Sequence, residues 1–412
     1  MERFIGLIGM VLILGIAFLL SNNRRAINYR TVGVGLLLQL GLAVFILKTT
    51  VGKNTFAWLG AKIQRLLEMA DQGALFVFGP LVNKGLLDKV LGPENSFIFF
   101  FKVIPTIIFV AVLVNIMYHI GVMQRVVSVM AVGMKWLLGV SGAEAISNVA
   151  STFVGQVEAQ IMIKPYLKTM TNSELMSSMT GSFACIAGGV MATYIALGVP
   201  PEYLLAASIM AAPGALVISK IVYPETEEPE TQGTVKLKVE KAYVNLVDAI
   251  AGGAGDGLRV GLNVIAMLIG FIALIALLDL FLGKFGMMVG LPELSFKFVM
   301  GKIFFVFAWA MGVPVKDLTA AGSLMGTKLV VNEFVAYLDL VQMKHYLEPK
   351  TIAITSFALC GFANFSSIAI QVGGIGQLAP ERRADLARLG FKALICGTLA
   401  SYMSATIAGL LF

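Results

Sequence analysis

The chain has 412 residues, of which 58% are hydrophobic and only 13% are charged, and its mean hydropathy is +0.86. Soluble domains carry about 25% charged residues, so this composition excludes an ordinary soluble protein and indicates a polytopic membrane protein in contact with lipid. The net charge of +7 does not indicate nucleic-acid binding, because membrane proteins concentrate Lys and Arg in cytoplasmic loops. Two histidines and three widely separated cysteines predict neither a metal cluster nor a disulfide framework.

Apolar segments long enough to cross a membrane recur along the whole chain. About 20 apolar residues, at 1.5 Å per residue, cross about 30 Å of hydrocarbon. The first segment has no small-residue cleavage site, so it is predicted to be a helix and not a cleaved signal peptide. The sequence predicts eight transmembrane helices, at residues 4–21, 31–50, 97–120, 173–197, 203–222, 259–283, 351–372 and 386–411.

Basic residues between these segments predict the orientation of the chain, because Lys and Arg are enriched in cytoplasmic loops. Eight crossings with both termini in the periplasm place every basic cluster on the cytoplasmic side. The clusters are Arg24, Arg25 and Arg30; Lys164 and Lys168; Lys220, Lys236, Lys238 and Lys241; and Arg382, Arg383 and Arg388.

Three segments outside the spans are amphipathic. In residues 54–72 the apolar side chains fall on one helical face and the charged ones on the other, which is typical of a helix in the membrane interface. Residues 122–139 and 243–258 are predicted to be similar. The charged segment 224–241, which contains prolines, is predicted to be a solvated, mobile loop with only a structural role.

Two further segments are apolar but carry glycines and polar residues at membrane depth. Residues 142–168 contain Gln156 and Glu158, and residues 316–345 contain Glu333. A charged side chain near the bilayer centre costs roughly 2.5–3.5 kcal/mol on insertion scales, so such residues usually face a cavity or a substrate path. Each segment is predicted to be a re-entrant helical hairpin that enters and leaves the membrane on one side.

Each predicted hairpin is followed by an interrupted span and then by a smoother one, with the interruptions at 186–190 and 361–367. The crossings between the copies put the first hairpin on the cytoplasmic side and the second on the periplasmic side. The predicted fold is therefore all-α, with eight spans, two opposed hairpins and an inverted repeat. Broken helices at matching positions indicate a substrate site near the midplane. The predicted division is 1–141 mainly scaffold, 142–222 first transport repeat, 223–315 charged loop with an interfacial helix and the sixth span, and 316–412 second transport repeat.

Four motifs occur together in this part of the chain. They are VGQVE at 154–158, GAGDGLRVGLNVIAMLIGFIAL at 253–274, VNEFVAY at 331–337 and CGFANFSSIAI at 360–370. With these motifs in this order, the chain resembles the concentrative nucleoside transporter family from about residue 95 to the C-terminus. The resemblance implies a homotrimer in a bacterial inner membrane, in which each protomer has a scaffold and a transport domain that moves like an elevator.

The resemblance also implies a nucleoside site shared by the two repeats. Gln156, Val157 and Glu158 would lie against the nucleobase, since an amide and a carboxylate suit a base edge with donors and acceptors. Val190 would line the same pocket. Val157 stands where the family usually has threonine, so one side-chain hydroxyl is missing.

On the other side of the implied site, the second repeat would bind the ribose. Glu333, Asn364 and Ser367 would take the ribose hydroxyls, and Phe362 would supply an aromatic wall. The implied substrate is a uridine-like nucleoside. No cofactor is expected besides a coupling ion.

The resemblance places a sodium site between the first hairpin and the fourth span, at Ser151, Val154, Cys185 and Ile186. Sodium-coupled members generally have Asn at the position of Ser151 and Ser at that of Cys185. A thiol is a poor ligand for a hard cation that prefers oxygen. The site is thus weakened for sodium, and a proton is the alternative coupling ion.

Two other functional classes fit the sequence less well than a transporter does. A membrane-embedded enzyme needs a nucleophile or metal ligands, and the sequence contains no HExxH or GxSxG motif. A channel needs an open pore, whereas opposed hairpins indicate alternating access. Glu158 and Glu333 could also be structural partners of neighbouring helices. The residues predict a transporter that is not an enzyme, and the resemblance implies a cation-coupled nucleoside importer. The alternatives are a transporter of another small polar metabolite and, less favoured, a membrane-embedded enzyme.

Overall fold

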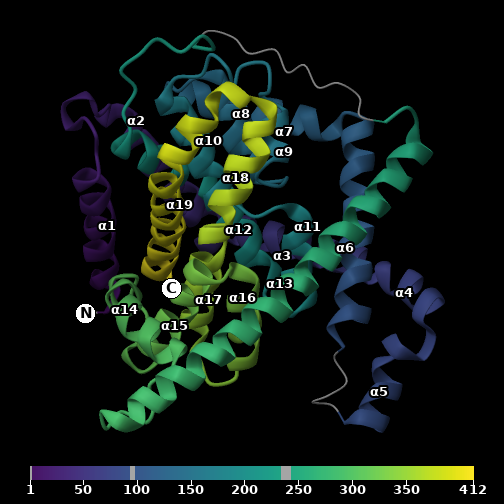
Figure 1. Ribbon diagram of the computed structural model, residues 1–412. Coiled ribbons are helices and arrows are strands. Elements are labelled where there is room, and N and C mark those ends of the chain that lie inside the picture. The colour runs from purple at the N-terminus through teal and green to yellow at the C-terminus, as the bar shows by residue number, and fades with distance from the viewer. Residues whose placement is uncertain (1, 93–97, 233–242) are drawn as a thin grey trace.

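Helices make up all of the regular secondary structure in the computed structural model, which describes residues 2–92, 98–232 and 243–412 (Figure 1). The N-terminal helices α1 and α2 pack against α12 and α19, while α6 packs along α13. The helices up to the first hairpin are α1 (Glu2–Leu19), α2 (Tyr29–Lys48), α3 (Thr50–Glu68), α4 (Ala70–Phe78), α5 (Lys84–Leu91), α6 (Phe99–His119) and α7 (Val122–Leu138).

The remaining helices form two series that each begin with a hairpin. The first series is α8 (Gly142–Ser151), α9 (Glu158–Ile161), α10 (Asn172–Ala184), α11 (Gly188–Ala196) and α12 (Pro201–Val222). After α13 (Leu246–Met288) and α14 (Phe296–Ala310), the second series is α15 (Leu318–Val330), α16 (Glu333–Met343), α17 (Pro349–Leu359), α18 (Phe365–Leu378) and α19 (Arg383–Leu411).

Long apolar helices confirm a multi-span, all-α membrane protein. The predicted span 4–21 forms the shorter apolar helix α1, and 351–372 is divided between α17 and α18, so the count of eight crossings stays a prediction. Within the described ranges, six helical segments are long and apolar enough to cross a membrane: Tyr29–Lys48, Phe99–His119, Asn172–Ala196, Pro201–Val222, Leu246–Met288 and Pro380–Leu411.

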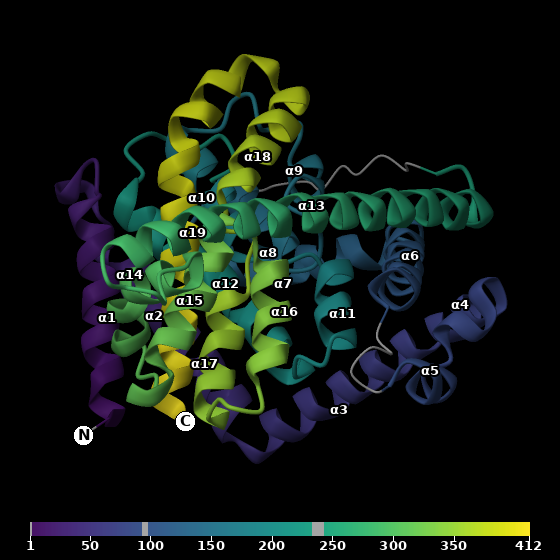
Figure 2. The same cartoon turned by 60° about the horizontal axis from the view of Figure 1, so that its bottom comes forward.

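One long helix replaces two predicted elements. α13 has 43 residues and is about 64 Å long at 1.5 Å per residue, and it crosses the whole molecule in Figure 2. The prediction of a separate interfacial helix at 243–258 is therefore wrong. The glycines of this segment do not interrupt the helix but let it approach α6: a Cβ on Gly257 would lie 2.6 Å from the Ile108 Cα, and one on Gly253 would lie 2.7 Å from the Val112 Cα.

The structure also contains helices that the sequence pattern did not predict, namely α4, α5 and α14. α14 packs closely against the first arm of the second hairpin, where a Cβ on Gly322 would lie 2.6 Å from the Gly301 carbonyl oxygen. At 15 residues, α14 is shorter than a full span and carries Lys297 and Lys302, so it gave no transmembrane signal.

Two amphipathic helices were predicted correctly. α3 buries Phe56, Gly60 and Leu67 on one face, as the pattern in residues 54–72 requires. In α7 the buried side chains recur every three or four residues, which is the spacing of one helical face, and the helix packs against α8. The buried residues of α7 are Met123, Val127, Ala131, Met134 and Leu138.

Both predicted hairpins are present, and they lie toward opposite ends of the molecule in Figure 1. In hairpin 1, α8 leads to an irregular tip at 152–157 and then to α9. In hairpin 2, α15 and α16 are separated only by Val331 and Asn332, and the Asn332 side chain caps α16 by accepting from the Val335 N–H at 2.9 Å.

The two interrupted spans meet in the interior. α10 ends at Ala184 before α11, and α17 ends at Leu359 before α18. The Phe362 N–H donates to the Cys185 carbonyl at 3.2 Å, which joins the two breaks directly. Gly361 has a φ of +137° and lies so close to α10 that a Cβ would be 2.6 Å from the Phe183 carbonyl oxygen. Only glycine fits this crossing.

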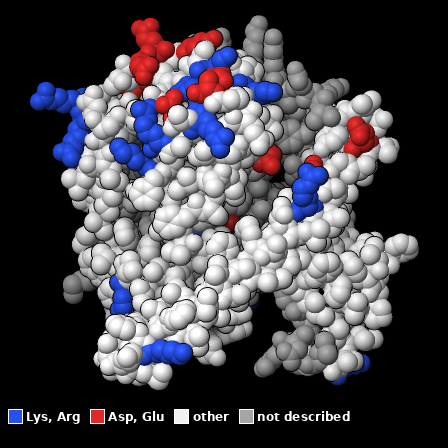
Figure 3. Space-filling view, in the orientation of Figure 1, with Lys and Arg blue, Asp and Glu red and all other residues white. Residues whose placement is uncertain are grey.

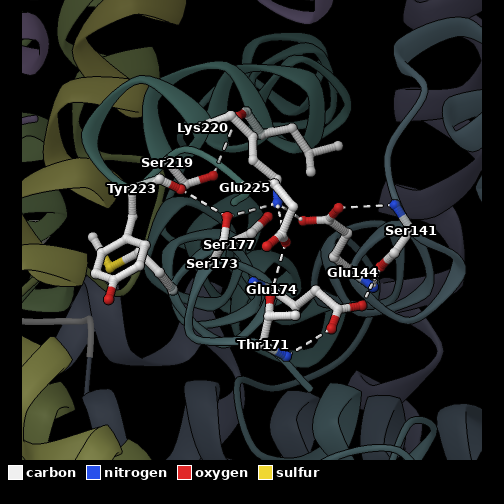
Figure 4. A network of polar contacts seen from close by, with 12 residues as sticks. Ser141, Glu144, Thr171, Ser173, Glu174, Ser177, Ser219, Lys220, Tyr223 and Glu225 are labelled. Atoms are coloured by element: carbon white, nitrogen blue, oxygen red, sulfur yellow. Dashed lines mark hydrogen bonds and ion pairs between the residues drawn. The ribbon is translucent and has the colours of Figure 1, made fainter. Parts of the chain in front are cut away.

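A buried polar network, here called the anchor network, fixes the start of hairpin 1 (Figure 4). It consists of Ser141, Glu144, Thr171, Ser173, Glu174, Lys220 and Glu225. Glu144 and Glu174 complete capping boxes at the N-termini of α8 and α10. The Lys220 ammonium lies 2.8 Å from a Glu144 carboxylate oxygen and donates to the Ser173 hydroxyl at 2.9 Å. This one lysine from α12 therefore links both helix starts.

The segment after α12 is part of this arrangement. Glu225 accepts from the Thr171 hydroxyl at 2.8 Å, and Thr231, which is 3% exposed, accepts from the Gly142 N–H at 3.0 Å. Residues 226–228 are exposed, as predicted for a solvated loop. Glu225 and Thr231 are instead held by these hydrogen bonds, and Thr231 satisfies free N–H groups at the start of α8. The rest of that prediction, with Lys236, Lys238 and Lys241, lies outside the described residues.

Candidate functional site

A cavity of about 120 Å³ lies between the hairpin tips, the broken helices and α13. Six of the eight residues predicted to bind substrate line it, and they come from both repeats: Gln156, Val190, Glu333, Phe362, Asn364 and Ser367. The other residues of its wall are Val264, Met267, Leu268, Asn332, Phe334, Ser366 and Ile370.

Glu333 supplies a buried carboxylate to the wall of the cavity. It is the first residue of α16 and is 5% exposed, so its carboxylate lies at the N-terminus of that helix. One carboxylate oxygen accepts from the Tyr194 hydroxyl at 3.1 Å, and the other accepts from the Asn364 amide at 3.0 Å. A carboxylate has about four acceptor positions, so these two donors leave others for a ligand.

Asn364 is held by the start of α18. Its side-chain oxygen accepts from the Ser367 N–H at 2.9 Å and from the Ser366 hydroxyl at 2.7 Å. This cap fixes the orientation of the amide, so its nitrogen points to Glu333. Glu333, Asn364 and Ser367 thus lie together on one polar wall of the cavity, and the role toward ribose that the resemblance implies for them stays a prediction.

Gln156 presents an amide on the opposite repeat. Its side chain is 8% exposed, and its oxygen lies 3.4 Å from the amide nitrogen of Gln371 in α18. Gln371 is completely buried and also donates to the Met179 carbonyl at 3.3 Å. Gln371 therefore positions Gln156 beside the apolar side chains of Val190 and Phe362.

The structure does not bring Val157 and Glu158 to the cavity. Val157 packs against Gly374 of α18, where it leaves no room for a Cβ. Glu158 is exposed, and its carboxylate folds over Gly155 at the tip of hairpin 1. The tip backbone therefore decides which of the three neighbours Gln156, Val157 and Glu158 faces the cavity.

The residues predicted to hold a cation lie together, deep beneath the tip of hairpin 1. Ser151, Val154, Cys185 and Ile186 are all at most 4% exposed. The Ser151 hydroxyl donates to the Ser147 carbonyl at 2.8 Å and lies 3.2 Å from the Ser182 hydroxyl. The Cys185 thiol contacts the Thr152 hydroxyl at 3.7 Å. The oxygens that these contacts bring together include the hydroxyls of Ser151, Ser182 and Thr152 and the main-chain carbonyl of Ser147, and oxygen ligands suit a hard cation.

Comparison with known proteins identifies the family. Residues 203–409 match the model for the Na+ dependent nucleoside transporter C-terminus, residues 8–81 match that for the N-terminus, and residues 100–200 match a nucleoside recognition domain. The chain belongs to the concentrative nucleoside transporter family. The resemblance seen in the sequence is thereby confirmed, and the protein is a nucleoside transporter and not an enzyme.

Similar proteins cover the whole transporter. It is 44% identical to the uncharacterized transporter YutK of Bacillus subtilis over 98% of both chains, and 38% identical to the nucleoside permease NupC of Helicobacter pylori over 98% of this chain and 96% of that one. A structure of CNTnw in an inward-facing substrate-bound state matches 100% of this chain and 98% of that one, with 41% identity and a TM-score of 0.94. Another CNTnw structure, in an outward-facing state, matches with a TM-score of 0.95. Alternating access is therefore the mode of transport.

Several polar residues of the transporter site were missed in the sequence. Tyr194 and Gln371 orient Glu333 and Gln156 without standing in a quoted motif. Gln371 had a usable signal, because it lies one helical turn after Ser367 in an otherwise apolar run. Tyr194 had none, since a tyrosine in an apolar span is ordinary and only the fold brings it to Glu333.

Proposed function

We propose that this transporter imports uridine-like nucleosides together with a cation. The observation that carries the proposal is the buried Glu333 carboxylate, which is held from two sides and has acceptor positions free at the cavity wall. A ribose offers two neighbouring hydroxyl donors, which a carboxylate accepts well. Asn364 and Ser367 add further polar groups on the same wall.

The opposite wall suits a nucleobase. Val190 and Phe362 offer apolar and aromatic surface, and Gln156 offers one donor and one acceptor to a base edge. We propose that Val157 and Glu158 join this wall when the hairpin 1 tip rearranges during transport. Glu158 then exchanges its contact with Gly155 for one with the base.

The packing supports an elevator mechanism with α6 and α13 in the scaffold. These two helices lie along each other, with Gly253 and Gly257 at the contact. The hairpins, the broken helices, α12 and α19 form the proposed moving body. The sequence division placed residues 1–141 mainly in the scaffold, but α1 and α2 pack on α12 and α19, so we propose that these two helices travel with the moving body.

We propose a homotrimer in a bacterial inner membrane with both termini in the periplasm. The two termini lie at the same end of the molecule in Figure 1, near α14 and α15. Charged side chains gather toward the opposite end, where hairpin 1 begins, and leave a broad uncharged belt below it (Figure 3). An edge rich in Lys and Arg is typical of a cytoplasmic face.

The ribose assignment predicts discrimination between close analogues. Uridine is expected to bind the purified transporter at least about 100-fold more tightly than 2′,3′-dideoxyuridine or free uracil, because each missing hydrogen bond to a charged group costs about 1.5–3 kcal/mol. Isothermal titration in lipid nanodiscs measures all three affinities. Equal binding of uridine and the dideoxy analogue would show that the polar wall does not bind the ribose.

The composition of the cation site predicts weak sodium coupling. With Ser151 and Cys185 in place of stronger oxygen ligands, sodium is expected to raise uridine affinity by less than the usual coupling of about 1–3 kcal/mol. Ser151→Asn should increase the effect and Ser151→Ala should remove it. Uridine affinity is measured in sodium chloride and in choline chloride for the three proteins. A dependence on pH but not on sodium in all of them would instead favour proton coupling.

A further inference from the structure

Hairpin 2 contains a completely buried lysine. Lys328 lies in the last turn of α15 and is 1% exposed. Its ammonium donates to the Ala358 carbonyl at 2.8 Å, and it lies within electrostatic range of the Glu333 carboxylate. Removing a lysine charge from water is costly unless partners compensate for it, so the position of these partners is informative.

The main partner of Lys328 is the end of a helix. Ala358 is in the last turn of α17, where carbonyls lack an N–H partner from their own helix. Neighbouring carbonyls there are also taken up from outside: Ser356 accepts from the Tyr337 hydroxyl at 2.7 Å, and Cys360 accepts from the Ser401 hydroxyl at 2.9 Å. The C-terminus of a helix carries partial negative charge and attracts cations. Lys328 thus supplies a cation to the broken end of α17.

The same junction in the other repeat is the proposed site of the coupling cation. Cys185 follows Glu158 by 27 residues, and Cys360 follows Glu333 by the same 27, so the two hairpins and breaks correspond. In repeat 1, Cys185 caps the C-terminus of α10, and the Ser151 hydroxyl lies 3.2 Å from the Ser182 hydroxyl in the last turn of that helix. In repeat 2, the ammonium of Lys328 stands at the end of α17.

We propose that Lys328 is a built-in monovalent cation, which occupies in repeat 2 the place that the transported cation takes in repeat 1. Half-helix ends that bind cations recur at the centre of transporters with inverted repeats. Lys328 holds the hairpin 2 tip against the α17 break at all times, and so it positions Glu333 without a dissolved ion. The proposed ribose wall, formed by Glu333, Asn364 and Ser367, is then permanently in place. The proposed base wall, formed by Gln156, Val190 and Phe362, depends on the cation under hairpin 1. This inference rests on the proposed nucleoside function.

The test removes the ammonium group of Lys328 and supplies a small ammonium ion in solution instead. Lys328→Ala removes three methylenes and the ammonium, and n-propylammonium has the same atoms. Without nucleoside, n-propylammonium is expected to raise the melting temperature of Lys328→Ala. It should not change the melting temperature of the unmodified transporter. Uridine affinity should fall at least about tenfold in the variant, as expected for loss of a charge-assisted contact, and should recover with n-propylammonium. The melting measurement does not involve a nucleoside, so it remains valid even if the proposed substrate is wrong.

Matched controls separate charge from packing. n-Propanol, which has the same shape without the charge, should not restore the variant, and Lys302→Ala on the exposed surface of α14 should leave affinity and melting unchanged. Lys328→Arg should keep uridine binding and Lys328→Met should lose it. If the alanine variant does not fold, the uridine affinities of the arginine and methionine variants decide whether the charge of Lys328 is required. Three results would each overturn the proposal: restoration of the alanine variant by n-propanol, no response of that variant to n-propylammonium, or a methionine variant that binds uridine like the unmodified protein.

Discussion

Glu333→Gln is expected to reduce uridine affinity by about 100-fold or more. The amide keeps the size of the side chain but loses its charge, and its NH₂ group meets the donating amide of Asn364 or the donating hydroxyl of Tyr194. The two ribose hydroxyls then no longer donate to a charged carboxylate, and each such hydrogen bond contributes about 1.5–3 kcal/mol to binding. Isothermal titration with uridine measures the effect, and the melting temperature shows whether the protein remains folded.

Two variants serve as comparisons for Glu333→Gln. Glu348→Gln removes an exposed carboxylate next to the same hairpin, which pairs with Lys316 at 2.9 Å, and it should leave uridine affinity unchanged. Glu158→Ala should weaken binding by less than Glu333→Gln, because Glu158 lies outside the cavity here. If Glu333→Gln unfolded the protein while the folded fraction bound uridine normally, Glu333 would be a structural partner of its neighbouring helices.

Lys220→Met is expected to lower the free energy of unfolding by about 3–5 kcal/mol, since it leaves buried carboxylates without their cation. The side chains of Lys220 and Glu144 are only 7% and 2% exposed, and Glu174 is close by in the same anchor network. Denaturant titration in detergent micelles measures the change. The double variant Lys220→Met with Glu144→Gln should recover part of the loss, because the uncompensated charge is removed.

Lys316→Met is the control for this prediction. Lys316 also pairs with a glutamate, but its side chain is 60% exposed, and exposed ion pairs contribute little to stability. An equal loss of stability in Lys316→Met and Lys220→Met would mean that burial of the anchor network is not what makes Lys220 important.

The sequence predicted best those features that are anomalous for a lipid environment. Polar residues and glycines at membrane depth located both hairpins and both helix breaks, because each such residue is unfavourable in lipid unless the fold uses it. The separate helix predicted at 243–258 is wrong because nothing in the local pattern shows that the glycines at 252–257 lie inside one long helix and bring α13 against α6.

Other features depended on contacts between distant residues. Nothing in the local pattern of 224–232 indicates that Thr231 completes the N-terminus of α8. Tyr194 and Gln371 become part of the site only when α11 and α18 meet the hairpins. The places of Val157 and Glu158 depend on the backbone of the short irregular tip at 152–157. The periodicity of apolar residues does not predict which of these tip residues faces the cavity.

The backbone link from Phe362 to Cys185 has a consequence for selectivity. We expect this hydrogen bond to keep the two helix breaks together beside the cavity, also when the tip of hairpin 1 rearranges as proposed. The rearrangement then changes the part of the pocket next to Val157 and Glu158, while the part between the breaks keeps its dimensions. If the proposed nucleoside site is correct, analogues that differ at the ribose should have the same rank order for uptake and for efflux, whereas the order of analogues that differ at the base can change.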